Sequence, residues 1–172
     1  MEIALLYKNC LRIKGKRATF VVDPTKQDKV TYDATIVMTQ EAASLFIQPD
    51  VVVIDGPGEY EIAGVKMSAT RDSDGGVAYS LVVDAVEILL GRISTLEKMQ
   101  NKLKEQHVVV AYADAAISAS FVTSLATNAI VFYGDQAMGL ASSLGKADIE
   151  AVGKYSVTHD KLPQEVETVV LE

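Results

Sequence analysis

Residues 54–69, IDGPGEYEIAGVKMSA, are the stretch that decides how the fold of this chain is interpreted. They close an apolar run at residues 51–55 and pass through a Gly-Pro-Gly turn into a second apolar run, in which we expect a bend at Gly64. In the turn, Pro57 fixes its own φ and Gly58 accepts a positive φ at little cost. The stretch therefore predicts two strands joined by a tight turn.

The Gly-Pro-Gly turn has little in common with a phosphate-binding loop. Such a loop opens a helix, so that free backbone amides point at the anion. Here a strand-like run follows, and the carboxylates of Glu59 and Glu61 would repel phosphate. The sequence also lacks the G-x-x-x-x-G-K-[ST] phosphate loop and the G-x-S-x-G nucleophile elbow.

Other short apolar runs predict strands along most of the chain. We expect strands at residues 3–7, 10–15, 18–23, 34–38, 51–55, 60–69, 78–84, 86–91, 108–112, 129–133, 154–158 and 167–172. Helices are expected at 117–127 and 137–144, and behind a capping box formed by Ser94 and Glu97. A β-rich first half followed by a β-α-β second half predicts a mixed α/β sandwich of two sheets with helices outside, built as a single domain over residues 1–172.

Composition and charge exclude several classes of protein. The chain has 172 residues, is 49% hydrophobic and carries a formal net charge of −7, which argues against a nucleic-acid surface. No apolar run reaches a membrane span, and the first residues do not resemble a signal peptide, so we expect a cytoplasmic protein. The single Cys10 permits no internal disulfide. The basic cluster at residues 12–17 is interpreted as a solvated hairpin tip, with an anion site as the alternative.

Histidines are too few for a typical zinc hydrolase site. Zinc is held by three or more His, Cys or carboxylate ligands, whereas this chain contains His107 and His159 alone. We interpret His107 as a structural residue at a strand start, and His159 beside Asp160 as part of a surface loop or, alternatively, a base and its orienting carboxylate. Acidic residues stand near several strand ends, but none has diagnostic metal-ligand spacing: Asp23, Asp55, Glu59, Glu61, Asp72, Asp74, Asp84, Asp114 and Asp135. We therefore expect no cofactor.

Stretches across nearly the whole chain follow a known order. Beside residues 54–69 they are LRIKGKRATFVVDP (11–24), YDATIVMTQ (32–40), YSLVVDAVEILLG (79–91), VVVAYADAAISASFVTSLATNAIVFYG (108–134) and KLPQEVETVVLE (161–172). Together they resemble the small bacterial proteins of the metallo-β-lactamase fold, in a branch of predicted metal-dependent hydrolases. The resemblance implies an αββα sandwich, with a metal site in a cleft at one edge of the sheets.

The ligands that the resemblance implies are missing. The family pattern T-H-x-H-x-D-H would follow directly after the strand at 34–38, where this chain reads TQEAASL. Thr39 matches and Glu41 falls on a variable position. The three histidines and the aspartate are replaced by Gln40, Ala42, Ser44 and Leu45.

The remaining ligand positions have also changed. A further family histidine falls near Arg71, although Asp72 beside it is kept. The family's Gly-Asp, whose aspartate bridges two metals, corresponds to Gly91 and Arg92, and the last histidine falls at residues 133–135, which include Asp135. A divalent cation should therefore bind poorly at these positions.

Three hypotheses follow, and we favour the first. It is a catalytically inactive member of the fold that acts as a binding or scaffold module without a zinc site. The second is a hydrolase-like enzyme with a rebuilt cleft site that acts on an unknown small substrate and uses Glu41, Arg71, Asp72, Arg92 and Asp135. The third is an assembly subunit whose apolar loop either contacts a partner protein or second copy, or instead fills the old cleft; its residues are Ala42, Ala43, Leu45 and Phe46.

Overall fold

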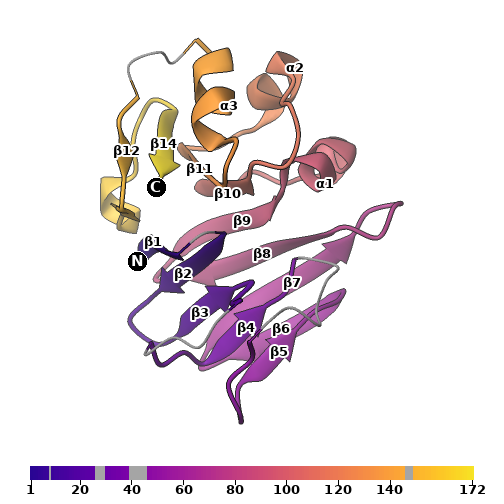
Figure 1. The fold of residues 1–172 in the computed structure, drawn as a ribbon, viewed down its shortest axis with the longest axis vertical. Helices are drawn as coiled ribbons and strands as arrows, with labels where there is room; N and C mark the ends of the chain where they lie inside the picture. The colour runs from indigo at the N-terminus through magenta and orange to yellow at the C-terminus, as the bar shows by residue number, and fades with distance from the viewer. Residues whose placement is uncertain (8, 26–29, 39–45, 146–148) are drawn as a thin grey trace.

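The computed structural model describes residues 1–172 except residue 8 and residues 26–29, 39–45 and 146–148. Its strands form two sheets (Figure 1). The six-stranded sheet has the spatial order β13 (Lys154–Ser156), β1 (Glu2–Tyr7), β2 (Cys10–Lys14), β3 (Thr19–Val22), β4 (Ala34–Ile36), β5 (Val52–Ile54). The eight-stranded sheet has the order β12 (Ala151–Val152), β14 (Glu167–Leu171), β11 (Ala129–Tyr133), β10 (Val108–Tyr112), β9 (Val86–Arg92), β8 (Val77–Val83), β7 (Val65–Arg71), β6 (Gly58–Ile62).

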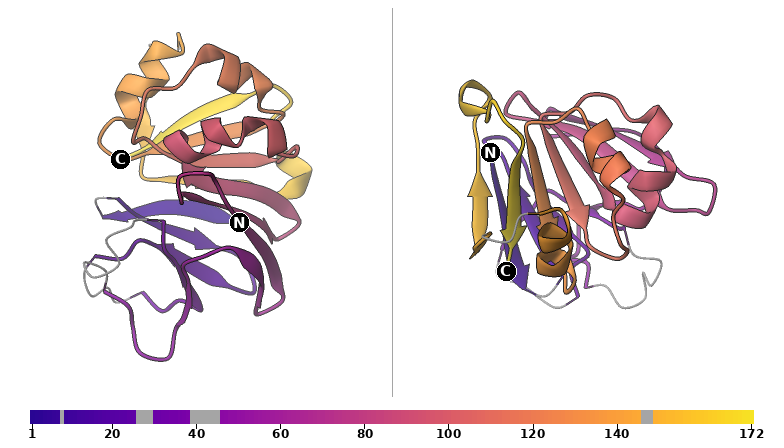
Figure 2. Two further views of the ribbon diagram at one scale, coloured as in Figure 1. Left: turned by 90° about the vertical axis from the view of Figure 1, so that its right-hand side faces the viewer. Right: turned by 90° about the horizontal axis from the view of Figure 1, so that it is seen from above.

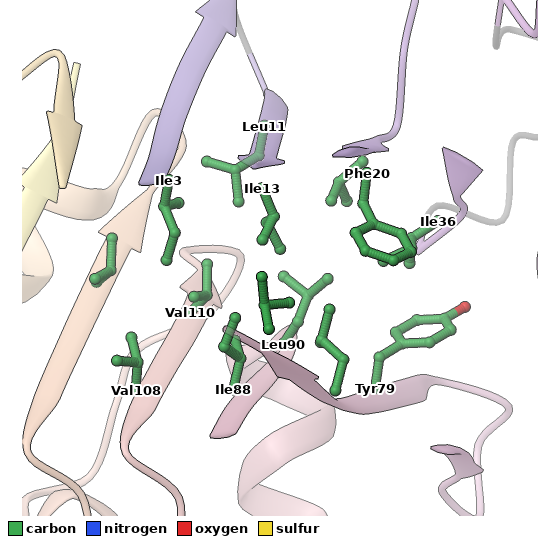
Figure 3. Close-up of a cluster of buried hydrophobic side chains, with 14 of the residues drawn as sticks. Ile3, Leu11, Ile13, Phe20, Ile36, Tyr79, Ile88, Leu90, Val108 and Val110 are labelled. Atoms are coloured by element: carbon green, nitrogen blue, oxygen red, sulfur yellow. The ribbon is translucent and has the colours of Figure 1, made fainter. Parts of the chain in front are cut away.

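The main core lies between the two sheets (Figure 3). Side chains alternate along each strand, so one face of each sheet supplies the core. Ile3, Ile13 and Phe20 come from the six-stranded sheet, and Ile88 and Val110 face them from the other sheet. This packing of two apolar faces holds the sandwich together.

A second core lies on the outer face of the eight-stranded sheet, where the helices pack (Figure 2). Their bounds are α1 (Ile93–Lys98), α2 (Ala119–Ser124) and α3 (Ala137–Ser143). Leu96 of α1, Phe121 of α2 and Leu140 of α3 are buried there. The apolar runs of β10 and β11 are buried on both faces for this reason, as parallel strands covered by helices commonly are.

The outer face of the six-stranded sheet carries a smaller apolar cluster. Cys10, Val21 and Tyr32 are buried in it, and Leu6 and Val51 pack against them. Within the described ranges, the α-helices all contact the other sheet. None of those helices combines the length and apolar character that a membrane span requires.

The predicted mixed α/β sandwich is confirmed, with local differences. Residues 60–69 are not one bent strand. They belong to the hairpin of β6 and β7, which turns at Ala63 and Gly64, both with positive φ. The helix expected at 117–127 is shorter, because it begins after the N-cap Ser118 and its C-cap Leu125 is already extended.

The predicted capping box at Ser94 and Glu97 is wrong. Helix α1 begins at Ile93, and no side-chain hydrogen bond caps it. The Ser94 hydroxyl donates to Asp114 Oδ2 at 2.6 Å, and Glu97 Oε1 accepts from the backbone amide of Ser118 at 2.8 Å. Partners distant in the sequence have taken the two side chains that local spacing assigned to the cap.

Candidate functional site

A cleft of about 730 Å³ opens at one edge of the sandwich. It lies where β4, β5, β7 and β9 reach their carboxyl ends, which is where open α/β sheets commonly bind ligands. The described residues that line it are Val37, Met38, Asp55, Arg71, Asp72, Asp74, Gly75, Gly76, Val77, Arg92, Ser94, Thr95 and Lys98. Most of these are polar or charged, with Val37, Met38 and Val77 as an apolar part of the wall.

One level of the eight-stranded sheet forms the border of the cleft, and we call its five residues the edge row. Arg71 pairs with Val77 across β7 and β8. Arg92 pairs with Tyr112 across β9 and β10, and Tyr112 pairs with Tyr133 of β11. Continuing the β8–β9 register by two residues places Arg92 beside Val77. The two arginines of the edge row are thus separated by two strand spacings, or about 9.6 Å between backbones.

The edge row faces the space between the two sheets. Because alternate residues of a strand share a face, Arg92 points to the same side as Leu90, which is fully buried in the main core. Arg71 likewise follows Ala69, another core residue. The arginines therefore stand where the apolar core ends and the cleft begins.

Arg92 is held from two sides. Its guanidinium carbon lies 5.2 Å from the centre of the Tyr112 ring, and its Nη1 lies 3.8 Å from Asp114 Oδ2. Asp114 is itself fixed by Ser94, whose backbone amide donates to Oδ1 at 3.1 Å. Within the described structure, the buried Nε of Arg92 has no hydrogen-bond partner, while 34% of the side chain is exposed.

Arg71 is the more open of the two arginines. It is exposed, and no ion pair or hydrogen bond joins its guanidinium to another described residue. A Cβ at Gly56 would lie 3.6 Å from Arg71 Nη2, an ordinary contact distance, so Gly56 borders the guanidinium. Asp55, which precedes Gly56, is exposed, and its carboxylate likewise has no ion pair within the described ranges.

The turn between β7 and β8 forms one wall of the cleft and depends on Asp72. Oδ1 of Asp72 accepts from the backbone amides of Asp74 and Gly76, both at 2.8 Å, so this carboxylate shapes the turn. The turn also packs on α1. A Cβ at Gly76 would lie 2.1 Å from Thr95 Oγ1, so only glycine fits there without a shift.

An ion pair joins this turn to helix α1. Lys98 Nζ of α1 lies 2.5 Å from Asp74 Oδ2. The hydrogen bond from Lys98 lowers the pKa of Asp74, and the bond to Asp74 raises the pKa of Lys98. These two charges largely neutralise each other and are less available to a ligand than the two arginines.

Two tyrosines lie beneath the cleft in the buried region. The Tyr79 hydroxyl donates to the carbonyl of Val37 at 2.7 Å, and burial raises the Tyr79 pKa well above its ordinary value. Tyr133 is also fully buried and burial raises its pKa, but its hydroxyl has no hydrogen-bond partner in the described structure. Nearby, Asp23 Oδ1 accepts from the backbone amide of Met38 at 2.8 Å and fixes the chain as β4 ends.

Three solved structures of similar architecture were compared with the chain. A protein from Thermotoga maritima, assigned to the Zn-dependent hydrolases of the metallo-β-lactamase superfamily, is 19% identical, with a TM-score of 0.74 over 100% of this chain and 99% of that chain. The isothiocyanate hydrolase from Delia radicum gut bacteria is 10% identical, with a TM-score of 0.62 over 92% and 99% of the two chains. The chain has the metallo-β-lactamase fold.

A protein from Parabacteroides distasonis, assigned as a metal-dependent hydrolase, is also similar to the chain in structure. It is 12% identical, with a TM-score of 0.60 over 99% of this chain and 93% of that chain. No protein-family model matches the sequence, and no curated protein matches it. At these identities the likeness establishes the fold, while activity has to be argued from the cleft.

The described residues of the cleft do not fit the metal that the metallo-β-lactamase fold implies. The described lining of the cleft holds no His or Cys. Within the described ranges, no group of three His, Cys, Asp or Glu residues could hold a metal ion. Of the carboxylates, Asp72 is bonded to the turn and Asp74 to Lys98. Arg71 and Arg92 place positive charge in the same space.

The predicted site residues are only partly brought together. Arg71, Asp72 and Arg92 line one cleft, whereas Asp135 lines a separate hollow with Asn9. Others lie outside the described residues: Thr39, Gln40, Glu41, Ala42 and Ser44. Of the apolar loop, Ala42, Ala43 and Leu45 also lie outside them; the next residue, Phe46, is half-buried, and its backbone amide donates to the carbonyl of Pro24 at 2.7 Å.

Sequence reasoning missed Lys98 as a cleft residue and Tyr112 as the side chain that packs on Arg92. The sequence pattern names neither residue for the site, and Tyr112 is only the last residue of the strand expected at 108–112. Register is the signal that finds Tyr112, since it is paired with Arg92. The two histidines lie elsewhere: His107 Nδ1 accepts from the backbone amide of Glu87 at 2.9 Å, and its ring centre is 5.2 Å from that of His159.

Proposed function

We propose that this protein is a catalytically inactive member of the metallo-β-lactamase fold, which acts as a binding or scaffold module without a zinc site. The observation that supports the proposal is the placement of Arg92. Its guanidinium is held in the cleft by Tyr112 and Asp114, at a position where the family resemblance implies a metal-bridging aspartate.

A fixed guanidinium opposes a divalent metal ion. Two unit charges about 4 Å apart repel by about 4 kcal/mol at an effective dielectric constant of about 20, and a divalent ion doubles that repulsion. Arg71 adds a second positive charge on the same cleft wall. Among the cleft carboxylates, Asp74 is paired with Lys98 and Asp72 accepts from the amides of the turn, which leaves Asp55 as the one unengaged acid of the described lining.

Elemental analysis of the purified full-length protein tests the proposal. We expect well under one tenth of a zinc, iron or manganese ion per chain, both as purified and after incubation with each metal and gel filtration. The quintuple variant Gln40→His, Ala42→His, Ser44→Asp, Leu45→His and Arg92→Asp, which restores the T-H-x-H-x-D-H motif and the bridging aspartate, should bind more zinc than wild type. Stoichiometric metal in the wild-type protein would overturn the proposal.

A second candidate function is a hydrolase-like enzyme with a rebuilt site. The observation in its favour is the open, polar cleft, in which Asp55 is exposed and could act as a general base. The Ser94 hydroxyl is engaged with Asp114, and no histidine lines the cleft to activate it. Turnover of an ester, lactone or phosphoester that disappears in Asp55→Asn would establish this function instead of the first.

A scaffold function requires a protein partner or a second copy of the chain. The apolar residues at 42–46 are the candidate contact, with filling of the old cleft as the alternative role. Size-exclusion chromatography with light scattering distinguishes a monomer from a self-associated protein. The measurement is repeated at low and high protein concentration. If the loop mediates self-association, Leu45→Ser with Phe46→Ser should dissociate the oligomer, while the exposed Val82→Ser should leave it intact.

A further inference from the structure

We propose that the cleft binds a small organic carboxylate, whose carboxylate group lies between Arg71 and Arg92 and whose apolar portion lies against Val37, Met38 and Val77. This inference rests on the proposed function, since it requires that no metal occupies the same space. It goes further by naming the chemical class of the ligand.

The two arginines of the cleft have donor groups available to an anion. Three cationic and three acidic side chains line the cleft. Lys98 and Asp74 form an ion pair with each other, and Asp72 Oδ1 accepts hydrogen bonds from two backbone amides. Arg71 has no ion pair with any described residue, and Arg92 has only the long 3.8 Å contact with Asp114. The two arginines therefore keep N–H donors available to an anion, while Asp55 keeps an unpaired negative charge among the described residues of the cleft.

The geometry of the edge row favours one shared anion. Arg71 and Arg92 flank Val77 at the same level of the sheet and point to the same side. Guanidinium groups hold carboxylates through two parallel N–H···O bonds, and two of them on either side of one anion can each supply such a pair. The Tyr112 ring packs against the guanidinium of Arg92 and limits its movement, so that less side-chain freedom is lost on binding.

The acids that remain in the cleft favour a single negative charge over two. Asp55 is exposed across from the arginines, and Asp72 lies beside Arg71. Both would repel a phosphate group, which carries about −1.5 to −2 at neutral pH, more strongly than a carboxylate. Asp55 is also placed to accept a hydrogen bond from a hydroxyl or ammonium group of the same ligand.

The apolar wall predicts that the ligand carries more than a carboxylate. Met38 and Val37 are almost fully buried, and they and Val77 face the same cavity as the arginines. Each methylene that a ligand buries there should tighten binding by about fourfold. A short-chain carboxylate should therefore bind more tightly than acetate.

Titration of the full-length, metal-free protein with acetate, butyrate, benzoate and inorganic phosphate tests the inference. Nuclear magnetic resonance of the arginine side-chain Nε–H groups provides the readout, because it reports on Arg71 and Arg92 directly. We expect saturable shifts of these two signals, with butyrate at least fivefold tighter than acetate and phosphate weaker than either. Tighter binding of phosphate, or no saturable shift with any carboxylate, would overturn the inference.

Three variants assign the binding to the two arginines. Arg71→Gln and Arg92→Gln should each weaken butyrate binding at least tenfold. Arg92→Lys, which keeps the charge but loses the planar fork, should weaken it at least threefold. The matched control is Arg17→Gln, since Arg17 is also exposed and lies at a distant hairpin tip; it should change affinity less than twofold. An equal loss in the control would attribute the binding to net charge and overturn the inference.

The outcomes separate this inference from the proposed function. Absence of metal together with absence of carboxylate binding would leave the binding-module proposal standing and remove this ligand class. Stoichiometric zinc in the wild-type protein would remove both. Circular dichroism of each variant verifies that lost binding does not reflect an unfolded chain.

Discussion

The guanidinium carbon of Arg92 lies 5.2 Å from the centre of the Tyr112 ring, and the two residues are direct partners in the parallel β9–β10 ladder. A cation over an aromatic face is worth about 0.5–1 kcal/mol at an exposed site and more when desolvated. Tyr112 also forms an edge-to-face pair with Tyr133, with ring centres 5.3 Å apart. One ring thus connects the cleft charge to the buried core.

Replacement of Tyr112 by leucine should therefore destabilise the protein and loosen Arg92. We expect the free energy of unfolding to fall by about 1–2 kcal/mol, since both ring interactions are lost. Tyr112→Phe keeps the ring and should cost less than about 0.5 kcal/mol. Urea unfolding followed by circular dichroism measures both. Equal losses in the two variants would mean that the hydroxyl, not the ring, carries the interaction.

Tyr133 and Tyr79 should respond in opposite ways to loss of their hydroxyl groups. The buried Tyr133 hydroxyl has no partner in the described structure, so Tyr133→Phe should be neutral or should stabilise by up to about 1 kcal/mol. Tyr79→Phe leaves the carbonyl of Val37 without its donor at 2.7 Å and should cost about 1–2 kcal/mol. Thermal unfolding of the two matched variants gives the comparison. If Tyr133→Phe lost more stability than Tyr79→Phe, the Tyr133 hydroxyl would have to make a stabilising hydrogen bond, which would contradict this prediction.

The strands were predictable from the sequence because their apolar runs are short, continuous and separated by turn residues. VVVAY at 108–112 and AIVFY at 129–133 become β10 and β11 with unchanged bounds. Helix ends were less predictable, because tertiary contacts decide them. Ser94 and Glu97 have capping-box spacing, yet Asp114 and the Ser118 amide take their side chains instead.

The cleft was only partly predictable. The family resemblance placed Arg71 and Arg92 at former ligand positions and Asp72 beside Arg71, and all three line one cavity. Tyr112 and Lys98 were out of reach, because their places depend on strand register and on the packing of α1 against the β7–β8 turn. Periodicity within one segment cannot report either of these relations.

Gly76 should tolerate no side chain, because α1 lies directly against it. Gly76→Ala places a Cβ 2.1 Å from Thr95 Oγ1, and we expect a loss of about 1–3 kcal/mol in the free energy of unfolding. The double variant Gly76→Ala with Thr95→Ala should recover part of that loss. Gly139→Ala is the matched control, because Gly139 lies in α3 with no atom within 4 Å of its built Cβ.

The control substitution should act in the other direction. Gly139→Ala should stabilise by about 0.5–1 kcal/mol, since alanine loses less backbone entropy than glycine on entering a helix. Chemical denaturation gives all three values under one set of conditions. If the double variant were no more stable than Gly76→Ala alone, the contact with Thr95 would not be the source of the destabilisation.

Tyr155 should make the protein less stable at alkaline pH. Burial, together with the neighbouring Glu167, whose Oε2 accepts from the Tyr155 hydroxyl at 3.4 Å, raises the pKa of Tyr155 to about 12. The unfolded chain releases the proton near the ordinary tyrosine pKa of about 10, whereas the folded chain retains it. This contribution to stability is therefore complete below about pH 10 and is lost as the pH rises toward about 12.

Two variants isolate the Tyr155 contribution in a series of thermal unfolding curves between pH 8 and about 12. Tyr155→Phe should show a shallower fall in Tm than wild type above pH 10, because one proton release has been removed. Glu167→Gln should give an intermediate slope, because it removes the carboxylate that opposes ionisation but leaves the burial unchanged. Since Tyr79 is buried as well, some alkaline loss should persist in both variants. A Tyr155→Phe curve parallel to wild type would show that this hydroxyl does not govern the alkaline limit.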